Sequence, residues 1–341
     1  MKTDFNYLPI DTVFIGRSAS EVLTGLLKKD QAGRIAIITG RSVSGTSYFK
    51  NLTSLNSSWK VFRNISQHSP IDEIREVANE IRDTGIEYLI SVGGGSVIDS
   101  AKMIRSMIST EIQQIAIPTT LSSAEFSHIA GYTENGEKRG IREKRLVPKY
   151  IILDPDATFE TPEILWRSSG IRAMDHAIES SLGSGMIDLR IQFSNISLNK
   201  LFANLAGKSR EEREECQLAS WYSYFDVYDS EMGFSHKIGK IIGARWNIPH
   251  GITSCITLPW VLRYYSLTSP VGLSKLSMLV TGRGGKEGIE MLADKIEEFV
   301  RDLSLTRKLS DFGISTEDVD YIMQKIDSTD DRLREQIINM L

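Results

Sequence analysis

Three consecutive glycines, Gly93, Gly94 and Gly95, have the residue type and position to bind a phosphate group through the backbone. The run Glu87–Val92 before them reads as a buried strand, and Ser96–Met107 after them has apolar residues at helical spacing. Glycine allows positive φ and a close approach of the backbone to a ligand. The free N–H groups at the start of a helix attract an anion. The turn therefore predicts a pyrophosphate site, or else a plain tight connection between a strand and a helix.

The segments around this turn alternate between strands and helices. The expected strands are Thr12–Ile15, Arg34–Thr39, Trp59–Phe62, Glu87–Val92, Gln114–Ile117 and Tyr150–Leu153. The expected helices are Ala19–Lys29, Thr46–Leu55, Ile71–Thr84 and Ser96–Met107. Continuous apolar runs such as Arg34–Thr39 are typical of parallel strands that are covered on both faces. The pattern predicts an open, mostly parallel α/β sheet with ligands at the carboxyl ends of its strands.

The later part of the chain has a different pattern. Residues 119–148 read as a loop-rich return, with a hairpin turn at Glu134–Glu137. From Thr161 onward helical patterning dominates, and Pro162 suits the first turn of a helix. We therefore expect an α/β dinucleotide-binding domain over residues 1–157 and a helical domain over residues 158–341.

Composition limits the class of protein. The chain has 341 residues, enough for two domains, and a formal net charge of −4 that gives no reason to expect a nucleic-acid or membrane partner. Two distant cysteines, Cys216 and Cys255, indicate neither disulfides nor a thiolate metal site. The chain shows no signal-peptide pattern and no apolar run of about 18 residues. A cytoplasmic protein is expected.

Four landmarks follow one another along the chain. They are the motif Gly93-Gly94-Gly95-Ser96-x-x-Asp99-x-Ala101-Lys102, the corner Pro118-Thr119-Thr120, the strand end Asp154-Pro155 and the later histidines His176, His236 and His250. Together they resemble the iron-containing alcohol dehydrogenase family, over nearly the full length. The resemblance implies a dehydroquinate synthase-like fold, with an all-α C-terminal domain. Residues 118–127, Pro-Thr-Thr-Leu-Ser-Ser-Ala-Glu-Phe-Ser, are most similar to the maleylacetate reductase branch, which has a serine–glutamate pair here.

The resemblance implies a nicotinamide cofactor. Its predicted contacts are the glycine turn with Ser96, then Asp99, Thr119, Thr120 and Lys138, although Lys138 can also be a solvated hairpin residue. Where many family members place an acidic residue for the ribose 2′-hydroxyl, this chain has Gly40, followed by Arg41. Without that carboxylate a 2′-phosphate is not repelled, and Arg41 could pair with it. We expect NADP(H) rather than NAD(H), unless Gly40 simply turns the chain.

The resemblance also implies a metal site, from which this chain departs. In the family an aspartate and three histidines bind a divalent ion, and the histidine positions are kept as His176, His236 and His250. The aspartate position is Arg172, and Lys240 stands where a further histidine often lies. Asp175 is not expected to substitute for the missing aspartate. It is one residue away from His176, and a one-residue step turns about 100° around a helix. Glu179 could orient His176 by a hydrogen bond, or lie on the surface.

Three alternatives follow for this cluster. In the first, no metal binds: Arg172 and Lys240 stabilise a developing alkoxide, and His236 or His250 gives the proton. In the second, the three histidines and a water hold iron or zinc, and Arg172 turns away. In the third, the cluster is inactive and the chain only binds a nucleotide.

We expect an NAD(P)H-dependent oxidoreductase that transfers a hydride to or from a carbonyl or alcohol carbon. Arg172 and Lys240 suit an anion, so the favoured substrate is a small carbonyl compound that bears a carboxylate, as in maleylacetate reduction. The alternatives are a metal-dependent dehydrogenase of neutral alcohols and aldehydes, and a non-catalytic nucleotide-binding protein. The resemblance implies a homodimer.

Overall fold

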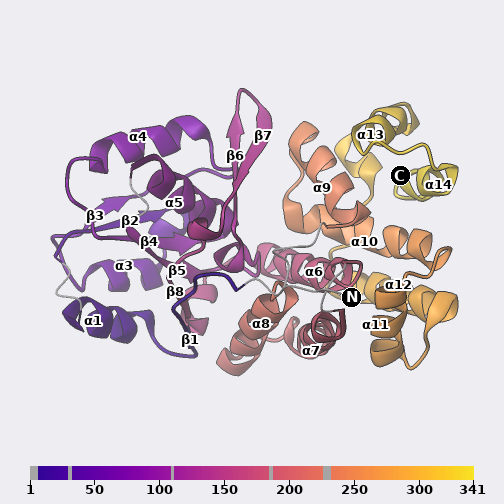
Figure 1. The fold of residues 1–341 in the computed structure, drawn as a ribbon, viewed down its shortest axis with the longest axis horizontal. Coiled ribbons are helices and arrows are strands. Elements are labelled where there is room, and N and C mark those ends of the chain that lie inside the picture. The colour runs from indigo at the N-terminus through magenta and orange to yellow at the C-terminus, as the bar shows by residue number, and fades with distance from the viewer. Residues whose placement is uncertain (1–6, 30–32, 109–110, 184–186, 226–231) are drawn as a thin grey trace. The chain divides into compact units, whose positions relative to one another are not determined.

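The computed structural model describes residues 7–29, 33–108, 111–183, 187–225 and 232–341. These residues form two compact units (Figure 1). The N-terminal unit comprises Tyr7–Pro162 and Gly207–Leu218, and the helical unit comprises Glu163–Ala206 and Ala219–Leu341. Among the described helices, none is long and apolar enough to cross a membrane.

A parallel sheet of six strands forms the centre of the N-terminal unit, in the order β1-β8-β5-β4-β2-β3. The strands are β1 (Thr12–Ile15), β2 (Ile35–Thr39), β3 (Lys60–Phe62), β4 (Tyr88–Gly93), β5 (Gln113–Pro118) and β8 (Tyr150–Leu153). Each lies within one residue of its predicted bounds. The register pairs Gly93 of β4 with Pro118 of β5, so the glycine turn and the threonine corner meet at the carboxyl edge of the sheet.

Helices cover both faces of this sheet (Figure 1). They are α1 (Ala19–Lys29), α2 (Arg41–Ser44), α3 (Ser47–Thr53), α4 (Ile71–Ile81) and α5 (Gly95–Ile108). Ala36 and Ile38 of β2 pack in one core with α4 and α5. Ile35 and Ile37 pack in a second core with α1 and α3. The strand is continuously apolar because alternate side chains enter two different cores.

The predicted loop-rich return is partly wrong. Its middle forms an antiparallel hairpin, β6 (Ile129–Glu134) and β7 (Glu137–Arg142). Asn135 and Gly136 join the strands with φ of 52° and 77°, as the predicted turn requires. The turn was predicted but its two strands were not, because the second strand consists largely of exposed charged residues, which carry little alternating apolar signal.

The helical unit confirms the predicted all-α second half. Its helices are α6 (Glu163–Ser180), α7 (Ile187–Asn204), the end of α8 (Arg210–Ser223), α9 (Phe234–Arg245), α10 (His250–Ser266), α11 (Val271–Thr281), α12 (Gly285–Asp302), α13 (Val319–Lys325) and α14 (Asp331–Asn339). Short 3-10 helices occur in both units. Ala124–Phe126, Lys144–Leu146 and Pro155–Thr158 belong to the N-terminal unit, and Leu309–Phe312 and Thr316–Asp318 belong to the helical unit. Helix α6 packs against α10. Gly251 permits this contact, because a Cβ there would lie 2.6 Å from the carbonyl carbon of Ser168.

Candidate active site

The glycine turn lies against the threonine corner. Thr119 donates its backbone N–H to the carbonyl of Gly93 over 3.0 Å. A Cβ on Gly94 would lie 3.2 Å from the side chain of Thr120, and one on Gly95 would lie 3.0 Å from Ser122 Oγ. The structure therefore brings the predicted turn and corner together. It also shows that these glycines are needed for the packing of the chain itself, besides any phosphate bound at the start of α5.

Ser96 and Asp99 anchor the N-terminal end of α5 to neighbouring segments. Ser96 Oγ accepts a hydrogen bond from the backbone N–H of His68 at 3.1 Å. Asp99 Oδ2 accepts from the backbone N–H of Gly131 in β6 at 3.0 Å, and its Oδ1 lies 3.0 Å from Lys102 Nζ. Asp99, a predicted cofactor contact, thus already holds the hairpin and a lysine in place.

Lys102, the last residue of the glycine motif, is fully buried, and no role was predicted for it. Besides Asp99, its Nζ donates to the carbonyl groups of Ala124 and Ile129, both at 2.7 Å. Burial lowers the pKa of Lys102, and Asp99 opposes that shift. This lysine joins α5 to the segment that follows β5 and to the hairpin.

Glu125 is a buried carboxyl group beside Lys102. It is 1% exposed, and within the described part of the chain its Oε2 has no hydrogen-bond partner. Burial raises the pKa of Glu125 to about 7, although the charge of Lys102 opposes the rise. The protein therefore holds a carboxyl that titrates near neutral pH.

Replacing Glu125 with glutamine should change how stability depends on pH. The raised pKa means that Glu125 contributes stability fully below its ordinary value of 4.5 and loses it as pH rises through about 7. Relative to the wild type, Glu125→Gln should gain up to about 3 kcal/mol of unfolding free energy between pH 4.5 and pH 8. Urea unfolding at several pH values measures this difference. The exposed control Glu137→Gln should show none, and parallel curves for Glu125→Gln and the wild type would contradict the prediction.

The N-terminal unit also contains the other predicted cofactor residues, Gly40, Arg41 and Lys138. Gly40 precedes α2, and a Cβ there would lie 3.0 Å from the carbonyl oxygen of Ile65 and 3.9 Å from Val97 of α5. A larger residue at this position, including an acidic one, would therefore require Ile65 to shift. Arg41 is exposed, and Lys138 is partly buried in β7, opposite Thr133.

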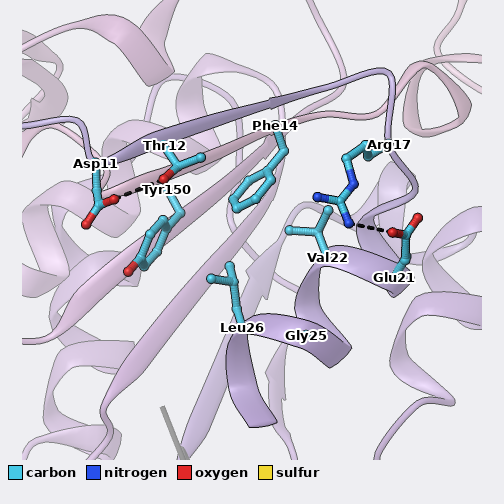
Figure 2. Close-up of a pocket in the computed structure, with 9 residues that line it drawn as sticks. All are labelled: Asp11, Thr12, Phe14, Arg17, Glu21, Val22, Gly25, Leu26 and Tyr150. Carbon is cyan, nitrogen blue, oxygen red and sulfur yellow. Dashed lines mark hydrogen bonds and ion pairs between the residues drawn. The ribbon is translucent and has the colours of Figure 1, made fainter. Parts of the chain in front are cut away.

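A separate pocket lies beside the edge strand β1 (Figure 2). Phe14 of β1, Leu26 of α1 and Tyr150 of β8 supply apolar walls, and Arg17 and Glu21 form an ion pair at its rim. Neither the glycine turn nor the other predicted cofactor residues line this pocket. It is therefore not the predicted nucleotide site.

In the helical unit, Asp175 lies at the centre of a buried polar cluster. Its Oδ2 accepts hydrogen bonds from Ser254 Oγ at 2.6 Å and Ser235 Oγ at 2.9 Å, and lies 3.4 Å from Arg172 Nη1. Its Oδ1 lies 3.4 Å from His236 Nδ1. Asp175, which was not expected to substitute for the family's aspartate, thus lies within the cluster, because α9 and α10 both pack against α6.

Glu179 is buried and hydrogen-bonds to His236, rather than orienting His176 or lying on the surface, the two predicted alternatives. Its Oε2 lies 2.7 Å from His236 Nδ1. Its Oε1 accepts from the backbone N–H of Ser235 at 2.8 Å. The start of α9 comes this close because Gly233 has no side chain; a Cβ there would lie 2.6 Å from Glu179 Oε1.

The charges of the cluster are strongly coupled. Burial raises the pKa of Glu179, and Asp175 adds to the rise. Burial alone would also raise the pKa of Asp175, but His236 and Arg172 bring it below its ordinary value. Burial lowers the pKa of His176 well below its usual range, with His236 and Arg172 acting in the same direction. His176 is therefore neutral at physiological pH.

His176 and His236 lie side by side in this cluster. The rings of His176 and His236 have centroids 4.8 Å apart. Among the residues that the structure describes, the buried His176 Nδ1 and His236 Nε2 have no hydrogen-bond partner. His250 begins α10 and is partly buried, and Lys240 is exposed on α9. Arg172, His176 and His236 thus lie together, whereas Lys240 is at the surface.

The metal-binding geometry differs from the predicted set. Among the described residues, the potential metal ligands whose binding atoms lie within 4.8 Å of one another are Asp175, Glu179 and His236. The predicted set of three histidines does not form such a group. Ser235 was not predicted; it directly precedes His236, so a polar neighbour of a predicted histidine was the available signal.

Comparisons with known proteins agree with this architecture. The sequence model of iron-containing alcohol dehydrogenase matches residues 11–155, and that of the C-terminal part of the family matches residues 167–335. A maleylacetate reductase from Rhizobium sp. strain MTP-10005 is 28% identical over 269 residues, 77% of this chain and 74% of that protein. Dehydrogenase ALT3 from Alternaria alternata is 26% identical and covers 85% of this chain and 91% of its own length.

Solved structures share the fold over the whole chain. A maleylacetate reductase from Agrobacterium tumefaciens has a TM-score of 0.85 at 22% identity, covering 100% of this chain and 98% of that chain. An alcohol dehydrogenase from Oenococcus oeni has a TM-score of 0.87 at 17% identity, covering 99% of each chain. The predicted family and its fold are confirmed: the chain belongs to the iron-containing alcohol dehydrogenase family and is an NAD(P)-linked oxidoreductase.

Proposed function

We propose that this protein reduces a small carbonyl compound bearing a carboxylate, with NADPH as hydride donor and without a bound metal ion. The proposal is supported chiefly by Arg172, which stands where the resemblance predicts the family's metal-binding aspartate. Its guanidinium belongs to the buried cluster with His176 and His236, where it would repel a divalent cation. The residues present therefore do not fit the family's iron site.

Arg172 is held in a way that suits anion binding. Within the described residues, both hydrogen bonds of Arg172 use Nη1, to Asp175 and to Ser254. Nε and Nη2 remain for a ligand, and a guanidinium can bind a carboxylate with two parallel hydrogen bonds. The names of the maleylacetate reductases among the relatives point to the same substrate class.

The N-terminal unit would bind the cofactor. The glycine turn, Ser96 and the threonine corner are proposed to hold the pyrophosphate and line its site. The absence of a carboxylate at Gly40 and the exposed Arg41 beside it favour a 2′-phosphate. Hydride would pass from the nicotinamide to the carbonyl carbon, while His236 or His250 gives a proton to the oxygen.

A combined metal and substrate assay tests this function. The protein is produced with iron and zinc supplied and purified without chelator, and its metal content is measured. NADPH and NADH oxidation are then followed with an oxo-acid and with an uncharged aldehyde of the same length. We expect substoichiometric metal and faster turnover of the oxo-acid with NADPH. Near-stoichiometric metal with aldehyde preference would establish the metal-dependent alternative, and cofactor binding without turnover would indicate a nucleotide-binding protein.

A further inference from the structure

Glu179 makes a short buried contact with His236. The carboxylate is fully buried and His236 is 3% exposed, and Oε2 lies 2.7 Å from Nδ1. A carboxylate in this position accepts a hydrogen bond from a protonated Nδ1. The contact therefore decides which ring nitrogen of His236 carries the proton in the neutral imidazole.

The carboxylate itself cannot turn easily. Oε1 accepts from the backbone N–H of Ser235, and Oε2 also accepts from that of His236 at 3.2 Å. These are N–H groups of the first turn of α9, where a negative charge is favoured. Tyr265 Oη accepts from the preceding N–H, that of Phe234, at 2.8 Å, which fixes the same turn. Both carboxylate oxygens are thus anchored to the helix that carries His236.

The other nitrogen of the ring is left for a ligand. Within the described part of the chain, His236 Nε2 is buried without a partner, an arrangement that is unfavourable until a ligand satisfies the atom. Asp175 lies 3.4 Å from His236 Nδ1 and also contacts Arg172, so the histidine and the proposed carboxylate-binding arginine share one buried anion. A ligand oxygen at Nε2 would satisfy the open atom.

We propose that Glu179 is a positioning residue that fixes His236 with its proton on Nδ1 and its Nε2 toward the substrate oxygen. This inference rests on the proposed function and selects His236, rather than His250, as the residue that exchanges the proton. In reduction, hydride forms the new C–H bond, the C=O π bond breaks, and Nε2–H of the imidazolium gives its proton to the oxygen. The neutral His236 that remains keeps its proton on Nδ1, where it is hydrogen-bonded to Glu179. Its Nε2 then regains a proton from solvent.

Nitrogen NMR and kinetics together test the inference. Protein labelled with ¹⁵N-histidine shows which nitrogen of neutral His236 carries the proton, with signals assigned by their loss in His236→Asn. We expect the Nδ1–H tautomer in the wild type and a mixture in Glu179→Gln. Glu179→Gln should lower kcat for oxo-acid reduction by about 10–100-fold, the usual effect of removing a partner that orients a histidine, with little change in the KM for NADPH. Glu179→Asp should recover part of kcat.

Glu163→Gln is the matched control, because Glu163 lies on the same helix and is 43% exposed. It should change neither kcat nor the spectrum of His236. An Nε2–H tautomer in the wild type, or full kcat in folded Glu179→Gln, would overturn the inference. The wild-type spectrum decides even when the variant does not fold. If the wild type reduces no oxo-acid, the proposed function fails, while the tautomer still supports or overturns the placement of Glu179.

Discussion

Replacing Lys102 with methionine should lower the free energy of unfolding by about 3–5 kcal/mol, the range for breaking one partner from a buried charge pair. The side chain is fully buried, so methionine fills much of its volume but offers no donor. The carbonyl groups of Ala124 and Ile129 and the carboxylate of Asp99 would each lose a hydrogen bond. Urea unfolding of the purified variant measures the loss.

The same substitution should weaken NADPH binding. Lys102 and Asp99 connect the helix that follows the glycine turn to the hairpin, so loosening them disorders the proposed pyrophosphate site. Lys60→Met is the control, because Lys60 is 41% exposed and pairs with Glu80 at the surface, where an ion pair contributes about 0–1 kcal/mol. Equal stability of the two variants would show that Lys102 is not a structural connection.

The contacts of Lys102 could not be predicted from the sequence. The strands and the glycine turn could be predicted because apolar period and glycine placement are local signals. The partners of Lys102 are backbone groups 22 and 27 residues away, and no local pattern indicates them. Glu125 was visible in a serine–glutamate pair, but only its burial beside Lys102 raises its pKa to about 7.

The helical cluster shows a second limit. The 100° step between Asp175 and His176 predicts that Asp175 does not take the place of an aspartate ligand. Residues three apart on a helix are also neighbours, and Asp175 lies three after Arg172, which it contacts. For Glu179 the helix face was predicted correctly, but its partner comes from α9, whose placement against α6 a local pattern cannot show.

Replacing Arg172 with alanine should reduce kcat/KM for an oxo-acid by roughly 10²- to 10³-fold, the effect of removing a buried cation that binds an anion. The loss for an uncharged aldehyde should be much smaller, because that substrate has no carboxylate for the guanidinium. Arg172→Lys should recover little, since an ammonium group cannot make two parallel hydrogen bonds to a carboxylate. Steady-state kinetics with both substrates measure the difference, and Arg301→Ala, which removes a 65% exposed arginine from α12, is the control.

Arg172→Asp tests the same position in the opposite sense. It places a carboxylate one helical turn before His176, where the resemblance predicts an aspartate, and a carboxylate with imidazole groups is a common ligand set for iron or zinc. Because the variant also leaves Asp175 without its cation, it adds a carboxylate to a cluster in which Asp175 and Glu179 already lie near His236, and a divalent ion would offset their repulsion. The variant should therefore bind metal when the wild type does not, as measured by elemental analysis. Equal metal content in the two proteins would mean that Arg172 does not determine whether this cluster accepts an ion.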